Sequence, residues 1–243
     1  MCGLVGICNF DNKPSVEVVK DMNQNLHHRG PDDEGYFNNE NISFGHKRLS
    51  ILDLKKSSQP MIDHSNKNII IFNGEIYNYK TIKKELLDFG YKFSTSGDTE
   101  VILKAYDKWG VDCLKKFEGM FVFALWDVSK KHLFLARDKF GEKPIFYKYS
   151  ENYGFVFSSE VKAFIKNDKL KKELELDYSS LNIYLSLNYL ISNKTFFKSI
   201  FSLEPAHFII INKENFLNIK PVKYWHLENF FLNKSKDNYS LAT

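Results

Sequence analysis

The chain has 243 residues, enough for one sizeable domain with its own packed core. Hydrophobic residues make up 43% of it and aromatic residues 16%, which excludes a disordered chain. The net charge of +4 is spread over clusters of mixed sign, so no basic stripe for a nucleic acid is present. Apolar runs are too short for a membrane span or a signal peptide. We therefore expect a cytoplasmic protein without nucleic-acid or membrane partners.

The first half of the sequence alternates short apolar runs with helical patterns. Strands are expected at four ranges: 3–10, 34–37, 41–52 and 68–78. Helices are expected at three ranges: 15–28, 78–90 and 99–110. Ser15 is the expected N-cap of the first helix, and the third begins behind Asp98. Gly90 and Gly110 are expected to end the second and third helices.

Two hairpins dominate the second half, at 119–138 and 145–159, each with two apolar strands and a polar turn. A charged stretch follows from about residue 167, and then a helical pattern at 179–190. Strands in runs, with helices grouped between them, predict antiparallel sheets packed with helices in an α+β domain. We divide the chain into a domain at 2–200 and a segment at 201–243 that holds the last strands and a linker.

The cysteine directly behind the initiator methionine is the first candidate for chemistry. Once Met1 is removed, Cys2 carries a thiol and a free α-amine, which is a nucleophile with its own base. The reference pKa of such an amine is about 8, close to working pH. A plain core cysteine in a first strand is the alternative. Cys8 and Cys113 complete no disulfide or zinc pattern with it, so reduced thiols are expected.

Eight motifs follow in a fixed order: MCGLVGI, HHRGPDDEG, GHKRLSILD, FNGEIYN, SGDTEVIL, GMFVFALWD, ARDKFGEKPIFY and FSSEVKA. Together they resemble the glutaminase domain of glutamine-hydrolysing asparagine synthetases, a class II glutamine amidotransferase. The resemblance implies an N-terminal-nucleophile hydrolase fold, with two stacked antiparallel sheets flanked by helices. The later stretch 195–212 is also similar, although Ala206 follows Pro205 where the family has glycine. This departure puts only the local turn geometry in question.

The resemblance implies a catalytic group of three residues. Cys2 would attack the side-chain amide carbon of glutamine and form a thioester with release of ammonia. Asn73, through its side-chain amide, and Gly74, through its backbone N–H, would form the oxyanion hole. An ordinary left-handed turn at Asn73-Gly74 is the alternative.

Further residues would bind the substrate. Arg48 would hold the α-carboxylate of glutamine, while Glu75 and Asp98 would receive its α-ammonium group. Main-chain groups of four residues would line the same pocket: Leu49, Ser50, Ile51 and Leu52. A surface role for Arg48 and a helix-capping role for Asp98 are the alternatives.

No metal site is expected. His27 and His28 precede Asp32 and Asp33, but the Arg-Gly-Pro between them favours a turn at a helix end. The stretch 137–144 lacks the spacing of a phosphate-binding P-loop and is interpreted as a loop between strands.

The family's second domain binds ATP through a Ser-Gly-Gly-x-Asp-Ser loop, which these 243 residues lack. The expected function is hydrolysis of L-glutamine to glutamate and ammonia for ATP-dependent asparagine synthesis from aspartate. No cofactor is expected for the glutaminase domain itself, and ATP and Mg²⁺ are expected only in a synthetase domain supplied in cis or in trans. Amidation of another carboxylate, such as a sugar acid, and an idle binding or regulatory domain stay open, as does a homodimer.

Overall fold

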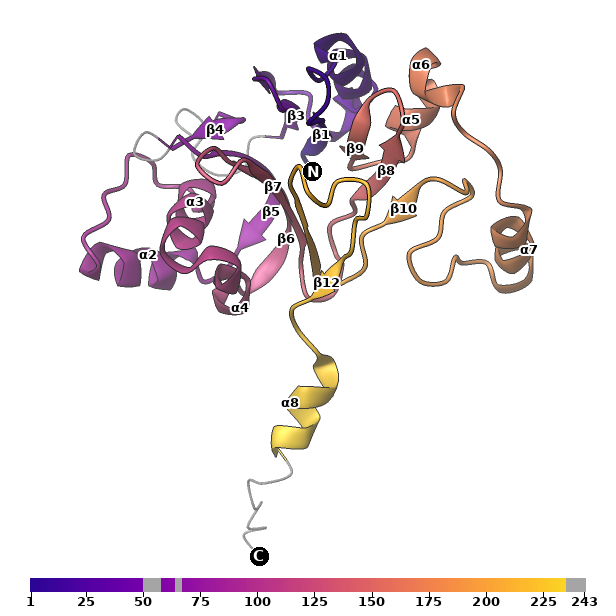
Figure 1. Cartoon of the computed structure of the whole chain (residues 1–243). Helices are drawn as coiled ribbons and strands as arrows, with labels where there is room; N and C mark the ends of the chain where they lie inside the picture. The colour runs from indigo at the N-terminus through magenta and orange to yellow at the C-terminus, as the bar shows by residue number, and fades with distance from the viewer. Residues whose placement is uncertain (50–57, 64–66, 235–243) are drawn as a thin grey trace, which may run out of the picture.

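Two stacked antiparallel sheets form the centre of the protein (Figure 1). The computed structural model describes residues 1–49, 58–63 and 67–234. The first sheet has the strand order β10-β8-β9-β1-β3-β2, and the second has the order β12-β11-β7-β6-β5-β4. The strands are β1 (Gly3–Cys8), β2 (Asp33–Asn38), β3 (Ile42–Arg48), β4 (Met61–Ile62), β5 (Ile69–Ile76), β6 (Gly119–Asp127), β7 (His132–Arg137), β8 (Phe146–Ser150), β9 (Gly154–Ser158), β10 (Phe201–Ser202), β11 (His207–Ile211) and β12 (Val222–Lys223).

Helices α1 to α6 lie on the outer faces of the two sheets, whereas α7 and α8 lie away from them (Figure 1). The α-helices are α1 (Val16–Gln24), α2 (Tyr79–Asp88), α3 (Asp98–Trp109), α4 (Cys113–Lys116), α5 (Lys162–Lys166), α6 (Asp168–Lys171), α7 (Tyr178–Leu187) and α8 (Leu227–Lys234). Two 3₁₀ turns, η1 (His27–Arg29) and η2 (Gly110–Asp112), complete them. None of the helices in the described part of the chain is long and apolar enough to span a membrane.

Three apolar layers hold the sheets and helices together. The layer between the sheets contains Phe44 of β3 and Trp126 of β6. A second layer joins the outer face of the β5-β6-β7 sheet to α2 and α3, and a third joins β1 and β9 to α1 and α5. β6 is covered on both faces, and its residues from Met120 to Trp126 are accordingly all apolar. The structure thus confirms the expected α+β sandwich of two sheets between helices.

Local sequence signals explain most of the element boundaries. The Ser15 hydroxyl accepts the Val18 N–H at 3.3 Å, which confirms it as the N-cap of α1. Both predicted hairpins are present, as β6-β7 and β8-β9. Helix α3 begins one residue earlier than expected, because Gly97 occupies the cap position and Asp98 is already helical.

The arrangement of β1 and β5 places the functional site. β1 lies inside its sheet, hydrogen-bonded to β3 on one side and to β9 on the other. β5 is paired with β6 along its whole length, but its other edge meets β4 only at Ile69 and Ile70. Beyond Ile70, no strand in the described part of the chain pairs with this edge, which we call the free edge of β5, and the residue before β1 contacts Asn73 on this strand.

The segment from residue 201 onward contributes strands to both sheets. β10 pairs with β8 at the edge of one sheet, and β11 pairs with β7 in the other. Helix α8 then extends away from the sandwich (Figure 1).

The turn before β11 contains a residue in an unfavourable backbone conformation. Ala206 has a φ of 61°, in the left-handed region where only glycine is free of strain. Its N–H donates to Asp138 O at 2.8 Å, and its carbonyl accepts the Tyr224 N–H at 2.8 Å. These two hydrogen bonds hold the turn in this conformation despite the departure from glycine.

We expect Ala206→Gly to raise the free energy of unfolding by about 1 kcal/mol, because it relieves the left-handed strain. Ala124→Gly in β6 is the matched control. Ala124 is buried in an ordinary strand, so the same substitution there should lower stability by about 1 kcal/mol. Urea denaturation measures both. A destabilised Ala206→Gly variant would contradict this explanation.

Candidate active site

A pocket of about 290 Å³ lies where the start of β1 meets the free edge of β5. Its lining comes from the two residues before β1, the end of β3, the segment before β4, β5, the start of α3, β6 and the loop before β8. The lining residues are Met1, Cys2, Arg48, Leu49, Gln59, Phe72, Asn73, Gly74, Glu75, Gly97, Asp98, Thr99, Met120 and Lys143.

The Cys2 thiol lies against the backbone at the end of β3. The Leu49 N–H donates to Cys2 Sγ at 3.4 Å, and Sγ lies 3.7 Å from Leu49 O. Burial raises the pKa of the Cys2 thiol above its usual value, and the Leu49 N–H offsets this only in part. The thiol is therefore protonated at rest and needs a base before it can attack.

Asn73 faces the nucleophile with its side-chain amide. The Cys2 N–H donates to Asn73 Oδ1 at 3.0 Å, which fixes the orientation of the amide. Asn73 Nδ2 is consequently turned away from Cys2 N, and this buried atom has no hydrogen-bond partner in the described part of the chain. A buried amide nitrogen without a partner is costly, so its presence in a pocket indicates a position for a ligand acceptor.

Gly74 contributes its backbone. Alternate residues of a strand direct their N–H groups to the same edge. Phe72 N–H donates to Gln59 Oε1 and Ile76 N–H to Asp98 Oδ2, both on the free edge of β5. Gly74 lies between them in this alternation, so its N–H faces the pocket. A Cβ at Gly74 would lie 2.1 Å from Met120 O at a φ of +151°, so only glycine fits.

Charged groups also line the pocket. Arg48, at the end of β3, and Asp98, at the start of α3, are both buried, and Glu75 of β5 lines the same cavity. Burial, together with the nearby Glu75 carboxylate, raises the pKa of Asp98 to about 6. The pocket therefore presents a guanidinium, an ammonium and two carboxylates in addition to the thiol.

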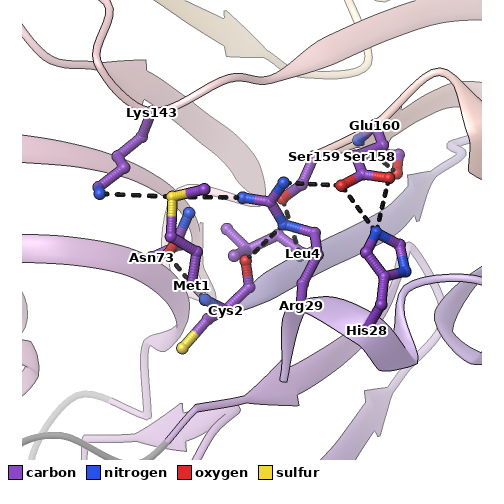
Figure 2. Close-up of polar contacts among 10 residues, drawn as sticks. All are labelled: Met1, Cys2, Leu4, His28, Arg29, Asn73, Lys143, Ser158, Ser159 and Glu160. Carbon is purple, nitrogen blue, oxygen red and sulfur yellow. Dashed lines mark hydrogen bonds and ion pairs between the residues drawn. The ribbon is translucent and has the colours of Figure 1, made fainter. Parts of the chain in front are cut away.

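The N-terminal segment is held by an ion pair that comes from two distant motifs (Figure 2). Arg29 Nε donates to Cys2 O at 3.0 Å, and Arg29 Nη1 pairs with Glu160 Oε1 at 2.8 Å. His28 Nε2 lies 3.0 Å from the same carboxylate. The N–H of Leu4 donates to the Ser159 hydroxyl at 2.9 Å. Cys2 is therefore fixed from behind by η1 and by the turn after β9.

Met1 lies at the rim of the pocket between two cations (Figure 2). Its Sδ is 3.6 Å from Lys143 Nζ and 3.9 Å from Arg29 Nη2. While Met1 is attached, the nitrogen of Cys2 is a peptide nitrogen and is no base. Removal of Met1 would free this amine inside the pocket.

The structure brings together all described residues of the sequence prediction, which are Cys2, Arg48, Leu49, Asn73, Gly74, Glu75 and Asp98. Ser50, Ile51 and Leu52 lie outside the described residues. Asp98 is not the N-cap of α3, because Gly97 holds that position, and its carboxylate also accepts the Ile76 N–H of β5 at 3.0 Å. The turn alternative for Asn73-Gly74 is wrong, because both residues belong to β5.

Two lining residues, Gln59 and Lys143, were not singled out from the sequence, and neither was the Arg29–Glu160 pair that holds the Cys2 backbone. Arg29 and Glu160 stand in quoted motifs, but nothing in the sequence shows that residues 131 positions apart form a pair. His28 pairs with Glu160, and η1 forms the expected turn. Among the described residues, no group of three or more His, Cys, Asp or Glu side chains is placed to bind a metal ion.

Comparison with known proteins agrees with this geometry. A family profile described as "Glutamine amidotransferase domain" matches residues 1–225. The chain belongs to the class II glutamine amidotransferase domains. This amidotransferase domain is 36% identical to a putative glutamine-hydrolysing asparagine synthetase of Methanocaldococcus jannaschii, over 95% of the chain and 47% of that relative. It is also 36% identical to asparagine synthetase 1 of Bacillus subtilis, over 90% of the chain and 35% of that relative.

Solved structures show the same fold at low sequence identity. Glutamine phosphoribosylpyrophosphate amidotransferase from B. subtilis, solved with ADP and GMP, aligns over 92% of the chain with a TM-score of 0.67 and 19% identity. An allosteric regulatory enzyme of purine biosynthesis aligns with a TM-score of 0.69 and 18% identity. The amidotransferase domain covers 49% of each of these chains and less than half of the two asparagine synthetases.

The raised pKa of Asp98 predicts a stability effect that depends on pH. The native state binds the Asp98 proton more tightly than the unfolded chain, whose ordinary pKa is 3.8. The resulting stability is complete below about pH 4 and is lost as the pH rises through about 6. Asp98→Asn should therefore match the wild type near pH 4 and exceed its unfolding free energy by about 2 to 3 kcal/mol above pH 7.

Asp127→Asn is the control with the opposite sign. Burial opposes ionisation there, but the Lys130 N–H and the Ser129 and Tyr106 hydroxyls lower the pKa of Asp127 to about 2. That variant should be less stable than the wild type at neutral pH, and the difference should shrink as the pH falls toward 2. Urea denaturation at pH values between 2 and 8 measures both effects. A difference between Asp98→Asn and the wild type that does not change with pH would contradict the burial argument.

Proposed function

We propose that this domain hydrolyses L-glutamine to glutamate and ammonia through a thioester on Cys2. The observation that carries the proposal is Asn73 Nδ2, which is buried without a partner among the described residues and belongs to a residue that lines the same pocket as the nucleophile. The family assignment and the asparagine synthetase relatives support glutamine as the substrate.

The first step uses the α-amine of Cys2 after Met1 is removed. The amine takes the thiol proton, directly or through one water, and Sγ attacks the δ-carbon of glutamine. A carbon–sulfur bond forms, and the carbonyl π electrons move onto the oxygen. The buried thiol is a poor nucleophile on its own, so this proton transfer is essential.

The oxyanion would lie between Asn73 Nδ2 and the Gly74 N–H. Both donors are held in place by β5 before the substrate arrives, so they need little reorganisation as charge develops. The protonated amine then gives its proton to the leaving nitrogen, and the carbon–nitrogen bond breaks to release ammonia. Water attacks the thioester with the amine again as base, which regenerates the thiol and yields glutamate.

The α-substituents of glutamine would occupy the charged side of the pocket. Arg48 would bind the α-carboxylate through two parallel hydrogen bonds, and the ionised Asp98 and Glu75 would bind the α-ammonium group. A carboxylate pair next to a guanidinium matches the zwitterion of an amino acid. Glutamine is thereby oriented with its side-chain amide toward Cys2.

The ammonia would serve a synthetase domain supplied in cis or in trans. Because the relatives named asparagine synthetase are two to three times as long as the matched region, we propose aspartate activated by ATP and Mg²⁺ in that domain as the acceptor. We propose a cytoplasmic location for both steps.

Glutamate release by the purified chain tests the proposal. Mature protein that begins at Cys2 should release glutamate, and Cys2→Ala should abolish release. Cys8→Ala is the matched control, because Cys8 ends the strand that Cys2 precedes and is buried between the sheets, so activity should persist. Equal rates in the wild type and the Cys2→Ala variant, or an inactive wild type even with its synthetase domain present, would contradict the proposal.

Arg48→Lys tests the binding end of the pocket. A lysine keeps the charge but loses the two-pronged geometry, so KM for glutamine should rise about tenfold to a hundredfold with a smaller change in kcat. Lys47→Arg on the same strand is the control, since Lys47 pairs with Glu34 outside the pocket and KM should not change. An Arg48→Lys variant with an unchanged KM would exclude the assigned role.

A further inference from the structure

The backbone of Phe72 is held by two buried side chains immediately before Asn73. Phe72 lies on the free edge of β5, where no strand pairs with it on that side. Its N–H donates to Gln59 Oε1 at 2.6 Å, and its carbonyl oxygen lies 3.1 Å from His46 Nε2. Both backbone groups of this edge residue are therefore satisfied by side chains.

The chemistry of the His46 contact fixes its direction. A carbonyl oxygen can only accept, so His46 Nε2 carries the proton and donates to Phe72 O. His46 is fully buried, and burial lowers the pKa of its imidazole to about 4. The ring is therefore neutral at neutral pH, and Nδ1 has no partner among the described residues. This hydrogen bond to Phe72 is the polar link that the ring makes in the described structure.

The two side chains belong to different parts of the site. His46 lies on β3, which is paired directly with β1, and Leu4 is its partner across that ladder. Gln59 lies in the segment before β4 and also lines the pocket. The His46 hydrogen bond thus crosses from the sheet that carries Cys2 to the strand that carries Asn73 and Gly74.

We propose that His46 and Gln59 form a clamp on the backbone N–H and C=O of Phe72. This clamp fixes the position of the two oxyanion-hole donors relative to Cys2. His46 and Gln59 are positioning residues, since neither has a role in the thioester chemistry proposed above. The inference rests on that proposed function and assigns the residues that keep its two donors in place. Among the described residues no strand performs this task at Phe72, because the β4 ladder ends at Ile70.

The clamp has an effect on the transition state because the oxyanion donors act over short distances. Phe72 O belongs to the peptide whose nitrogen is that of Asn73, so any shift of this peptide moves Asn73 and Gly74 together. An error of about 1 Å in such a group costs up to about a hundredfold in rate. Glutamine binding depends instead on Arg48, Glu75 and Asp98, so the loss should fall on kcat.

The experiment compares glutamine hydrolysis by His46→Leu, Gln59→Leu and His46→Gln in the mature full chain. The two leucine variants should lower kcat about tenfold to a hundredfold and leave KM within about twofold. His46→Gln keeps a donor at a similar reach and should restore most of kcat. Hydrogen exchange of the peptide that covers 70–77 should increase in the leucine variants and return toward wild type in His46→Gln.

Ile42→Ala is the matched control for lost stability. Ile42 lies on β3 and packs in the same layer between the sheets, without a hydrogen bond to β5. It should lower the melting temperature and leave both kcat and exchange at 70–77 unchanged. The clamp is overturned if His46→Leu retains kcat, if His46→Gln restores none of it, or if Ile42→Ala lowers kcat equally. An inactive wild type would contradict the proposed function instead, and the exchange measurement would then test the clamp alone.

Discussion

The free edge of β5 is the constraint on which the site depends. A strand edge exposes backbone groups that must find partners, and β4 supplies them only as far as Ile70. Beyond that point, Gln59 and His46 satisfy Phe72, and Asp98 satisfies Ile76. Gly74, between them, keeps its N–H for the pocket. An unpaired strand edge would destabilise an ordinary sheet, but here it leaves the Gly74 N–H as a preorganised donor for the pocket.

The site also contains groups that lower the stability of the native state. Asn73 Nδ2 is buried without a partner, and the Asp98 carboxyl is held where burial opposes its ionisation. Three apolar layers offset these costs, and the Arg29–Glu160 pair fixes Cys2 from behind. The apolar cores thus supply the stability of the native state, and the pocket can keep polar groups that find their partners only when a substrate binds.

Much of the fold and the central site residues could be predicted from the sequence. Alternating apolar patterns and turn residues indicated the β6-β7 hairpin, and the glycines behind α2 and α3 marked their ends. The motifs that resemble those of a known family allowed four site residues to be identified from the sequence: Cys2, Asn73, Gly74 and Asp98. Each of those motifs is local, so its residues are recognised without knowledge of the packing.

The supporting residues could not be found in this way. Arg29 pairs with Glu160, which lies 131 positions later in the sequence. His46 in one sheet hydrogen-bonds to Phe72 O in the other sheet. Such contacts depend on how the sheets stack, which hydrophobic patterning does not specify. Asp98 shows the same limit: its place before a helix suggested a cap, whereas tertiary packing directs its carboxylate to β5.

The most direct test of the account is intact-mass and peptide mass spectrometry of the mature chain, quenched in acid during turnover of glutamine. The account predicts a chain without Met1 that carries one γ-glutamyl group on Cys2, and this group should be released by hydroxylamine. Turnover with Met1 still attached, or with no acyl group on Cys2, would contradict the central claim.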